Sequence, residues 1–224
     1  MQSVVALMPM RHSSERVPGK NYRNFNDLPL FHHMAKTILN CPEVSQLVIN
    51  TDSETISEQC AAYFPEVKII SRPNHLLGGE VPMTEILRHD ADIVSSDWYL
   101  QVHSTSPLIR SETISSALNT LREQLDNYDS LFSVTRLQTR LYGQDFQPLN
   151  HDPQKLLRTQ DLPPIFEENS GMYIFTKDQI ESGQRFGSHP LLFEIDPIEA
   201  LDIDEESDFI VAETISRLRN TGSL

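Results

Sequence analysis

Short apolar runs alternate with longer amphipathic stretches through the first two thirds of the chain, and this alternation restricts the possible folds more than any other feature. The runs expected to form strands span residues 4–8, 46–51, 67–71, 98–103 and 130–135. The stretches expected to form helices span residues 29–40, 53–64, 83–95 and 111–125. Alternating strands and helices are typical of βαβ units. The sequence therefore predicts an α/β fold with a mostly parallel, Rossmann-like sheet flanked by helices.

Helix start signals and apolar periodicity refine this expectation. Two of the expected helices open with Ser-Glu-Thr, at Ser53 and Ser111, so we expect a serine hydroxyl to cap each helix and an acid to complement its dipole. Strands over 171–176 and 190–196 and a helix over 206–220 complete the chain. The apolar face of that last helix predicts that it docks on the sheet. Its members are Phe209, Ala212, Ile215 and Leu218.

Residues 138–164 interrupt the pattern, because they are rich in turn residues and lack a helical period. A long irregular segment inside a compact domain usually has a function of its own. We expect a hairpin excursion here and interpret it as a dimerisation arm. The length of 224 residues suits one domain, residues 1–224, that includes this arm.

The charge balance limits the partners. The chain has 32 acidic and 18 basic residues, a formal charge of −14, which argues against an extended surface for nucleic acid or anionic membranes. No apolar run reaches the roughly 20 residues of a membrane helix, and the first run is too short for a signal peptide. We therefore expect a cytoplasmic protein whose Cys41 and Cys60 are buried, reduced thiols.

A basic loop follows the first expected strand of this acidic chain. Between residues 9 and 23, Arg11, Arg16, Lys20 and Arg23 stand against a single acid, Glu15. A polar loop between a strand and a helix is where open α/β sheets bind phosphates, although the motifs GxxxxGK[ST] and GxGxxG are absent. Arg11, Arg16 and Lys20 could clamp a triphosphate. The uncharged side chains of Ser13, Ser14 and Asn21 could add hydrogen bonds to it. From composition alone, a solvated basic loop that binds no ligand is an equally good interpretation.

Two aspartates near the other end of the chain form a candidate metal site. Asp202 and Asp204 lie between an expected strand and the last helix, and residues two apart on an extended chain face the same side. Mg²⁺ prefers such oxygen ligands and shares them with substrate phosphates. The alternative for this pair is an ordinary acidic turn without a metal. Asp52, after the second expected strand, could either cap a helix or be a further ligand in the same site.

These residues resemble the acylneuraminate cytidylyltransferase family, whose members make CMP-activated sialic acids. The family's opening motif, Ala-Arg-x-x-Ser-Lys-x-x-Pro-x-Lys-Asn, is similar to MRHSSERVPGKN, and its Arg-Pro after the third strand is similar to SRP at residues 71–73. Leu-Gln-Pro-Thr-Ser resembles LQVHS at 100–104, Asn-Gly-x-x-Tyr resembles NSGMY at 169–173, and Asp-Ile-Asp is present at 202–204. The matches occur in the family's order across nearly the whole chain.

The resemblance implies a fold of the nucleotide-diphospho-sugar transferase type and the transfer of CMP from CTP to a 2-keto-3-deoxy sugar acid, with release of pyrophosphate. It further implies Mg²⁺ as cofactor and a homodimer whose arm reaches the neighbouring site. By resemblance, the residues fall into three groups: Arg11, Ser14, Arg16, Lys20, Asn21 and Arg72 for the nucleotide; Gln101, Arg158, Gln160, Asn169 and Tyr173 for the sugar acid; Asp202 and Asp204 for the metal. Arg11, Lys20 and the two aspartates are the expected catalytic residues.

Departures from the family pattern leave alternatives. Glu15 replaces the family's lysine, and SERVPGK is similar to the cytidylyltransferases for 3-deoxy-manno-octulosonate, which have an Arg at residue 16. The alternatives are therefore an octulosonate-type enzyme and a silent CMP-sugar-binding module. The aspartate pair offers a further alternative, a glycosyltransferase that uses the two aspartates for its metal.

Overall fold

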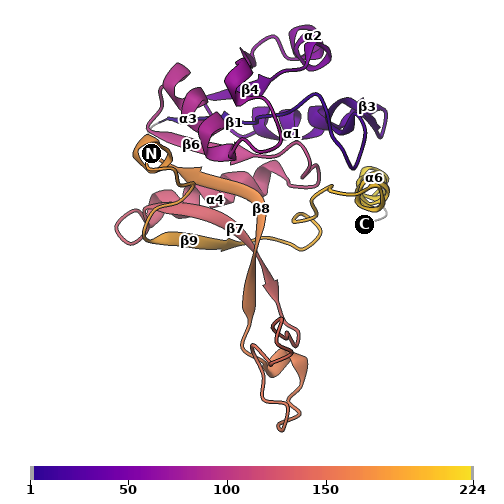
Figure 1. Ribbon diagram of the computed structural model, residues 1–224, viewed down its shortest axis with the longest axis vertical. Coiled ribbons are helices and arrows are strands. Elements are labelled where there is room, and N and C mark those ends of the chain that lie inside the picture. The colour runs from indigo at the N-terminus through magenta and orange to yellow at the C-terminus, as the bar shows by residue number, and fades with distance from the viewer. Residues whose placement is uncertain (1–2, 223–224) are drawn as a thin grey trace.

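The predicted α/β fold is confirmed in the computed structural model, which describes residues 3–222 (Figure 1). The sheet order is β5-β4-β1-β6-β8-β7-β9. Strands β5, β4, β1 and β6 run parallel, β8 runs antiparallel to β6 and β7, and β9 runs parallel to β7. The bounds are β1 Val4–Leu7, β4 Gln46–Thr51, β5 Lys68–Ser71, β6 Trp98–Val102, β7 Ser130–Leu137, β8 Ile165–Phe175 and β9 Pro190–Glu194. All of the expected strands form.

Helices cover both faces of this sheet. Their bounds are α1 Leu30–Leu39, α2 Glu54–Tyr63, α3 Met83–Ile93, α4 Ser111–Glu123, α5 Lys177–Glu181 and α6 Glu206–Asn220. Alternate residues of β1 enter different cores: Val4 and Ala6 pack with α1 and α4, whereas Val5 and Leu7 pack with α3. A strand buried on both faces is typical of a parallel sheet. Burial raises the pKa of both thiols, the free Cys41 and Cys60, to about 11, as expected for unreactive core cysteines.

One of the two expected serine caps forms. The Ser53 hydroxyl accepts the Ile56 backbone N–H at 3.3 Å at the start of α2. The prediction for Ser111 is wrong, because Arg110 takes the N-cap position of α4. Glu199 accepts hydrogen bonds from the Arg110 backbone N–H and guanidinium, and this fixes the helix start one residue earlier.

The predicted docking of α6 on the sheet is also wrong. Its buried residues Phe209 and Ala212 pack with Val17 and Phe25, outside the two cores of the sheet. Phe25 belongs to a small hairpin formed by β2 (Asn24–Phe25) and β3 (Leu28–Pro29), and Figure 1 shows α6 beside β3. The apolar face of α6 therefore covers the basic loop and its hairpin, and this brings two segments together that are far apart in the sequence.

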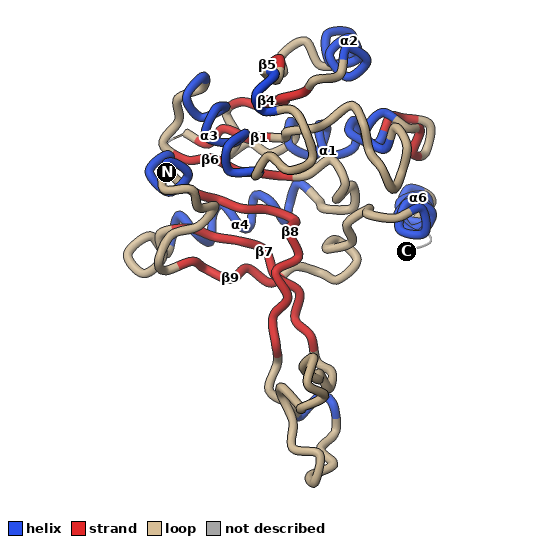
Figure 2. Tube along the Cα trace, in the orientation of Figure 1, coloured by secondary structure: helices blue, strands red, loops and turns tan. Residues whose placement is uncertain are grey.

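The expected hairpin excursion is present. Strands β7 and β8 continue beyond the sheet as a two-stranded ribbon up to the pair Leu137↔Ile165, and residues 138–164 form its loop-rich tip (Figure 2). The Asn150 side chain holds the tip together by donating to the Thr139 carbonyl (2.6 Å) and accepting the Leu141 N–H (3.0 Å). Phe146 and Leu156 are 85% and 91% exposed there. Across residues 3–222, no helix has the length and apolar character needed to span a membrane.

Candidate active site

The candidate site lies at the carboxyl ends of the parallel strands, where open α/β sheets bind ligands. A first cavity of about 550 Å³ opens there. The basic loop, Arg72, the start of α3, the residues after β6 and the aspartate pair surround it. The predicted nucleotide residues that line it are Arg11, Ser14, Arg16, Lys20, Asn21 and Arg72, together with Asp202 and Asp204. The structure thus gathers all of these predicted residues around one space.

The basic loop is shaped by one glycine. Gly19 has φ 66°, in the left-handed region that favours glycine, and a Cβ there would lie 2.9 Å from Tyr22 Cε2. The turn at Gly19 starts the short 3₁₀ helix Lys20–Tyr22, while Val17 on the preceding segment is fully buried. Lys20 is therefore held on a rigid turn, with a side chain only 12% exposed.

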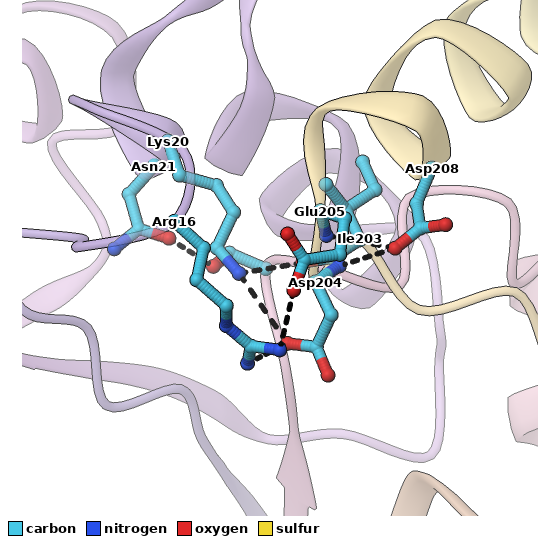
Figure 3. Close-up of polar contacts among 8 residues, drawn as sticks. Arg16, Lys20, Asn21, Ile203, Asp204, Glu205 and Asp208 are labelled. Carbon is cyan, nitrogen blue, oxygen red and sulfur yellow. Dashed lines mark hydrogen bonds and ion pairs between the residues drawn. The ribbon is translucent and has the colours of Figure 1, made fainter.

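Opposite charges from the basic loop and from the segment before α6 meet at the lining of the cavity (Figure 3). Lys20 Nζ donates to the Ile203 carbonyl at 2.5 Å and lies 3.8 Å from Asp204 Oδ1. Arg16 contacts Asp204 at 2.8 Å and Glu205 at 3.1 Å. Glu205 also caps α6 in a capping box with Asp208, as expected for acids of a first helical turn. The basic loop and the aspartate pair therefore form one site.

The aspartate pair fits a metal that shares substrate oxygens. Asp202 Oδ1 is buried and has no hydrogen-bond partner among the described residues. Burial, reinforced by Asp204, raises the pKa of Asp202. A buried carboxylate oxygen without a partner is costly unless a cation meets it. No group of three or more His, Cys, Asp or Glu side chains in residues 3–222 could hold a metal alone. Mg²⁺ needs only one or two carboxylates when phosphates and water complete its shell.

Arg11 and Asn21 have different tasks in the loop. The Arg11 side chain lines the cavity, is exposed, and has no hydrogen bond or ion pair within the described chain. The Asn21 amide donates to the Arg11 carbonyl at 2.8 Å and accepts from Ser104 Oγ at 2.7 Å. Asn21 thus ties the loop to the end of β6, whereas the Arg11 guanidinium remains available for an anion.

Arg72 belongs to a buried polar network that the sequence did not reveal. Its guanidinium donates to Asn50 Oδ1 (2.7 Å) and to the Met10 carbonyl (3.2 Å). Asn50 Nδ2 donates to Asp90 Oδ1 at 2.5 Å, and burial raises the pKa of Asp90. The available signal was Asp90 itself, an acid on the buried face of α3 beside Leu87. The network fixes Arg72 at the wall of the cavity.

Replacing Asn50 with Ala should destabilise the protein by about 3–5 kcal/mol, because it leaves a buried cation and a buried carboxylic group without their shared partner. Urea unfolding followed by circular dichroism measures this. Asn119→Ala on the surface of α4, where the side chain contacts Glu43 and Arg122, is the matched control and should cost less than 1 kcal/mol. An equal loss in both variants would contradict a structural role for the network.

Two further polar residues, Gln101 and His103, lie at the end of β6 and directly after it. Gln101 is fully buried, and its Nε2 lies 2.9 Å from His103 Nε2, while its Oε1 has no partner among the described residues. Burial, together with the charges of Arg185 and Lys20, lowers the pKa of His103 to about 4, so this imidazole is neutral near pH 7.

Asp52 neither caps α2 nor lines the cavity. Its carboxylate accepts the His12 backbone N–H at 2.7 Å and so supports the basic loop.

A second cavity of about 540 Å³ shares Asp202 and Asp204 with the first. Its other walls come from the base of the arm and the segment before the aspartate pair, and sequence reasoning identified only Asn169 among them. Those residues are Thr135, Glu167, Glu168, Asn169, Ser170, Pro197 and Ala200. The two aspartates are thus shared by two adjoining spaces: the first also has four basic side chains in its lining, whereas the charged side chains of the second are all acidic.

The predicted sugar residues separate into two groups. Asn169 lines the second cavity, donates to Thr135 Oγ1 (3.0 Å) and accepts from Ser133 Oγ (2.6 Å). Tyr173 pairs with Gln101 across β8 and β6, and its hydroxyl donates to Glu168. Arg158 and Gln160, in contrast, are exposed on the arm, and Arg158 is paired with Asp161 at 2.7 Å. Figure 1 shows the arm pointing away from the sheet, so neither residue enters the site of its own chain.

Comparison with known proteins identifies the family. Residues 5–219 match a family model described as Cytidylyltransferase. The chain belongs to the cytidylyltransferase family. Post-translational flagellin modification protein B of Campylobacter coli is 25% identical over 98% of this chain and 97% of its own length. CMP-N,N'-diacetyllegionaminic acid synthase of Legionella pneumophila is 27% identical over 96% of this chain and 97% of its own length. N-acylneuraminate cytidylyltransferase of Escherichia coli is 25% identical over 97% of this chain, which spans 53% of that relative.

Solved structures share the fold of this cytidylyltransferase. A CMP:2-keto-3-deoxy-manno-octonic acid synthetase complexed with CTP has a TM-score of 0.69 and 16% identity over 97% of this chain and 99% of its own. A 4-diphosphocytidyl-2C-methyl-D-erythritol synthase from Anaerococcus prevotii has a TM-score of 0.70 and 11% identity over 96% of both chains. The predicted family is confirmed, and these matches give no support to the glycosyltransferase alternative.

Proposed function

We propose that this cytidylyltransferase transfers CMP from CTP to the anomeric hydroxyl of a nonulosonic acid, a 2-keto-3-deoxy sugar acid of the N-acylneuraminate class, and releases pyrophosphate. The observation that carries the proposal is the pair of adjoining cavities with Asp202 and Asp204 between them. The first cavity, with its four basic side chains, suits a triphosphate, and the second cavity suits the acceptor. Relatives named for N-acylneuraminate, legionaminic and pseudaminic acids support this acceptor class.

In the proposed reaction, the anomeric oxygen of the acceptor attacks the α-phosphorus of CTP, the bond to the β-phosphate oxygen breaks, and the acceptor proton leaves to solvent. Arg11, Arg16 and Lys20 hold the triphosphate, Ser14 and Asn21 order the loop around it, and Arg72 faces the cytidine. Gln101, Asn169 and Tyr173 orient the acceptor. Positioning and charge neutralisation supply most of the rate enhancement in such transfers. Mg²⁺ held by Asp202 and Asp204 would neutralise phosphate charge when bound.

Pyrophosphate release with CTP and Mg²⁺ tests this function. The acceptor panel contains N-acetylneuraminic, legionaminic, pseudaminic and 3-deoxy-manno-octulosonic acids, and ATP, GTP and UTP replace CTP as controls. We expect turnover with CTP and at least one nonulosonic acid. Turnover with the octulosonic acid alone would favour the octulosonate-type alternative. CTP binding without turnover on any acid would favour the binding module.

The proposal includes a cytoplasmic homodimer in which the arm, residues 138–164, reaches the neighbouring subunit and presents Arg158 and Gln160 to its acceptor site. The exposed apolar side chains of the arm support a role in association.

Replacing both Phe146 and Leu156 with Asp should convert the dimer to monomers, because the two charges would have to be buried at the interface. Sedimentation velocity at micromolar concentration measures this. Tyr63→Asp, at a 68% exposed position on α2, is the control and should leave the mass unchanged. A wild-type protein that sediments as a monomer would contradict the homodimer.

A further inference from the structure

An arginine that belongs to none of the sequence motifs lies beside the predicted acceptor residues. Arg185 is in the segment between α5 and β9, and its Cζ stacks 3.8 Å from the centre of the Tyr173 ring. Tyr173 is fully buried, whereas the Arg185 side chain is 25% exposed. A guanidinium stacked on a fixed aromatic ring has a defined position, and stacking does not use its in-plane N–H donors. Arg185 is therefore preorganised on a side chain that is partly exposed.

The ion pair of Arg185 is weak for such a group. Its NH2 atom lies 3.8 Å from Glu168 Oε1, the outer limit of an ion pair, and Glu168 also accepts the Tyr173 hydroxyl. No direct hydrogen bond joins Arg185 to Glu168 in the described part of the chain. A guanidinium has five N–H donors and matches a carboxylate in bidentate geometry. Arg185 can therefore accept a second, closer carboxylate.

Arg185 is in the lining of neither cavity, but it lies beside residues that line them. Glu168 and Ser170, which both contact the Tyr173 hydroxyl, line the second cavity. His103, whose pKa the charge of Arg185 helps to lower, lines the first cavity. Gln101, opposite Tyr173 in the sheet, has the buried Oε1 that lacks a partner among the described residues. Arg185 thus lies within reach of residues from both cavities.

The second cavity needs a cation for an anionic ligand. Its lining includes Glu167, Glu168, Asp202 and Asp204 and no basic side chain. Arg16 and Lys20 contact Asp204 from the triphosphate side, and Arg158 is paired on the arm. An acceptor carboxylate brought against these acids without a cation would be repelled.

We propose that Arg185 binds the carboxylate of the acceptor sugar acid and so makes the enzyme specific for acids over neutral sugars. This inference rests on the proposed function. It assigns carboxylate recognition to the subunit whose cavity binds the acceptor, so the arm of the partner subunit is not needed for that contact.

Steady-state kinetics with a matched pair of acceptors test the inference. The probes are the acid that the wild-type enzyme turns over fastest in the panel and its methyl ester, which lacks the charge. At saturating CTP, Arg185→Met should raise the KM for the acid about 10- to 100-fold. It should leave the KM for the ester and for CTP unchanged, so the preference for acid over ester disappears. Arg185→Lys should keep part of that preference because it retains the charge.

Two other variants complete the design. Arg122→Met, at an exposed position on α4, should behave as wild type. Arg158→Met tests the arm, and loss of the acid preference there but not in Arg185→Met would overturn the inference. An equal KM increase for acid and ester in Arg185→Met would also overturn it, because Arg185 would then only support Tyr173 and Glu168. Absence of wild-type turnover with every acid would overturn the proposed function and this inference together.

Discussion

Replacing Asp202 with Asn should lower kcat about 100- to 1000-fold while the protein remains folded. Asp202 adjoins both cavities, and its buried Oδ1 is the oxygen best placed for a cation shared with the triphosphate. Loss of one preorganised electrostatic contact to a reacting phosphate has an effect of this size. Pyrophosphate release at saturating CTP and acceptor measures it. Asp204→Asn should act in the same direction, since Asp204 is the other expected ligand.

The same substitution should not destabilise the protein without Mg²⁺. Burial raises the pKa of Asp202, so its charged form is disfavoured in the fold. An acid whose pKa is raised in the folded state contributes to the free energy of unfolding at low pH. This contribution is lost as the pH rises above the pKa of the unfolded state, about 4. Asn carries no charge and avoids that loss. Thermal unfolding near pH 7 should therefore show a midpoint for Asp202→Asn at or above that of wild type.

Asp126→Asn, in the exposed turn after α4, is the control for charge removal and should match wild type in both measurements. Mg²⁺ with CTP should raise the melting midpoint of wild type and of Asp126→Asn but not of Asp202→Asn. Full turnover by Asp202→Asn at saturating substrates would contradict the metal role of the aspartate pair.

Replacing Lys20 with Met should lower kcat/KM for CTP about 100- to 1000-fold. The methionine retains most of the apolar stem, so the loss reports the ammonium group. Burial lowers the pKa of Lys20, yet the two aspartates oppose this effect, and the charge is held at the cavity wall. An immobilised cation near the triphosphate stabilises charge in the transition state without reorganisation. The assay is pyrophosphate release at limiting CTP.

Lys36→Met on the exposed face of α1 is the matched control and should keep wild-type kinetics. If Lys20→Met raised only the KM for the acceptor and left kcat/KM for CTP unchanged, the triphosphate would have to bind away from Lys20. Comparison with Arg11→Ala separates the two cations, because the Arg11 guanidinium supports nothing else in the described fold, whereas Lys20 also bonds to Ile203.

The fold could be predicted because its signals are local. Strand runs, turn residues and apolar periodicity each depend on neighbouring residues, so the helices and the excursion at 138–164 could be located from the sequence. The docking of α6 could not, because an apolar face such as that of Phe209 and Ala212 does not specify which surface covers it. Ser111 failed as a cap for a similar reason: a distant acid, Glu199, holds Arg110 in that place.

The candidate site shows the same division. Arg11, Lys20, Asp202 and Asp204 could be named from motif spacing, and the structure brings them together. The roles of these residues stay predictions. Asn50 and Glu168 could not be found in this way, because their places in the site depend on tertiary contacts with Arg72 and Tyr173. Motifs identify groups that meet a ligand through local geometry, whereas supporting groups appear only after folding.

The packing of α6 on the basic loop has a consequence for biosynthesis. During translation, the loop around Arg16 and Lys20 leaves the ribosome long before Asp204 and Glu205, which are its ionic partners. Until α6 emerges, Val17 and Phe25 lack the apolar cover that Phe209 provides. A nascent chain can therefore form the parallel strands early, yet it acquires a closed nucleotide cavity only when the last helix is made. Incomplete chains should consequently be unable to sequester CTP.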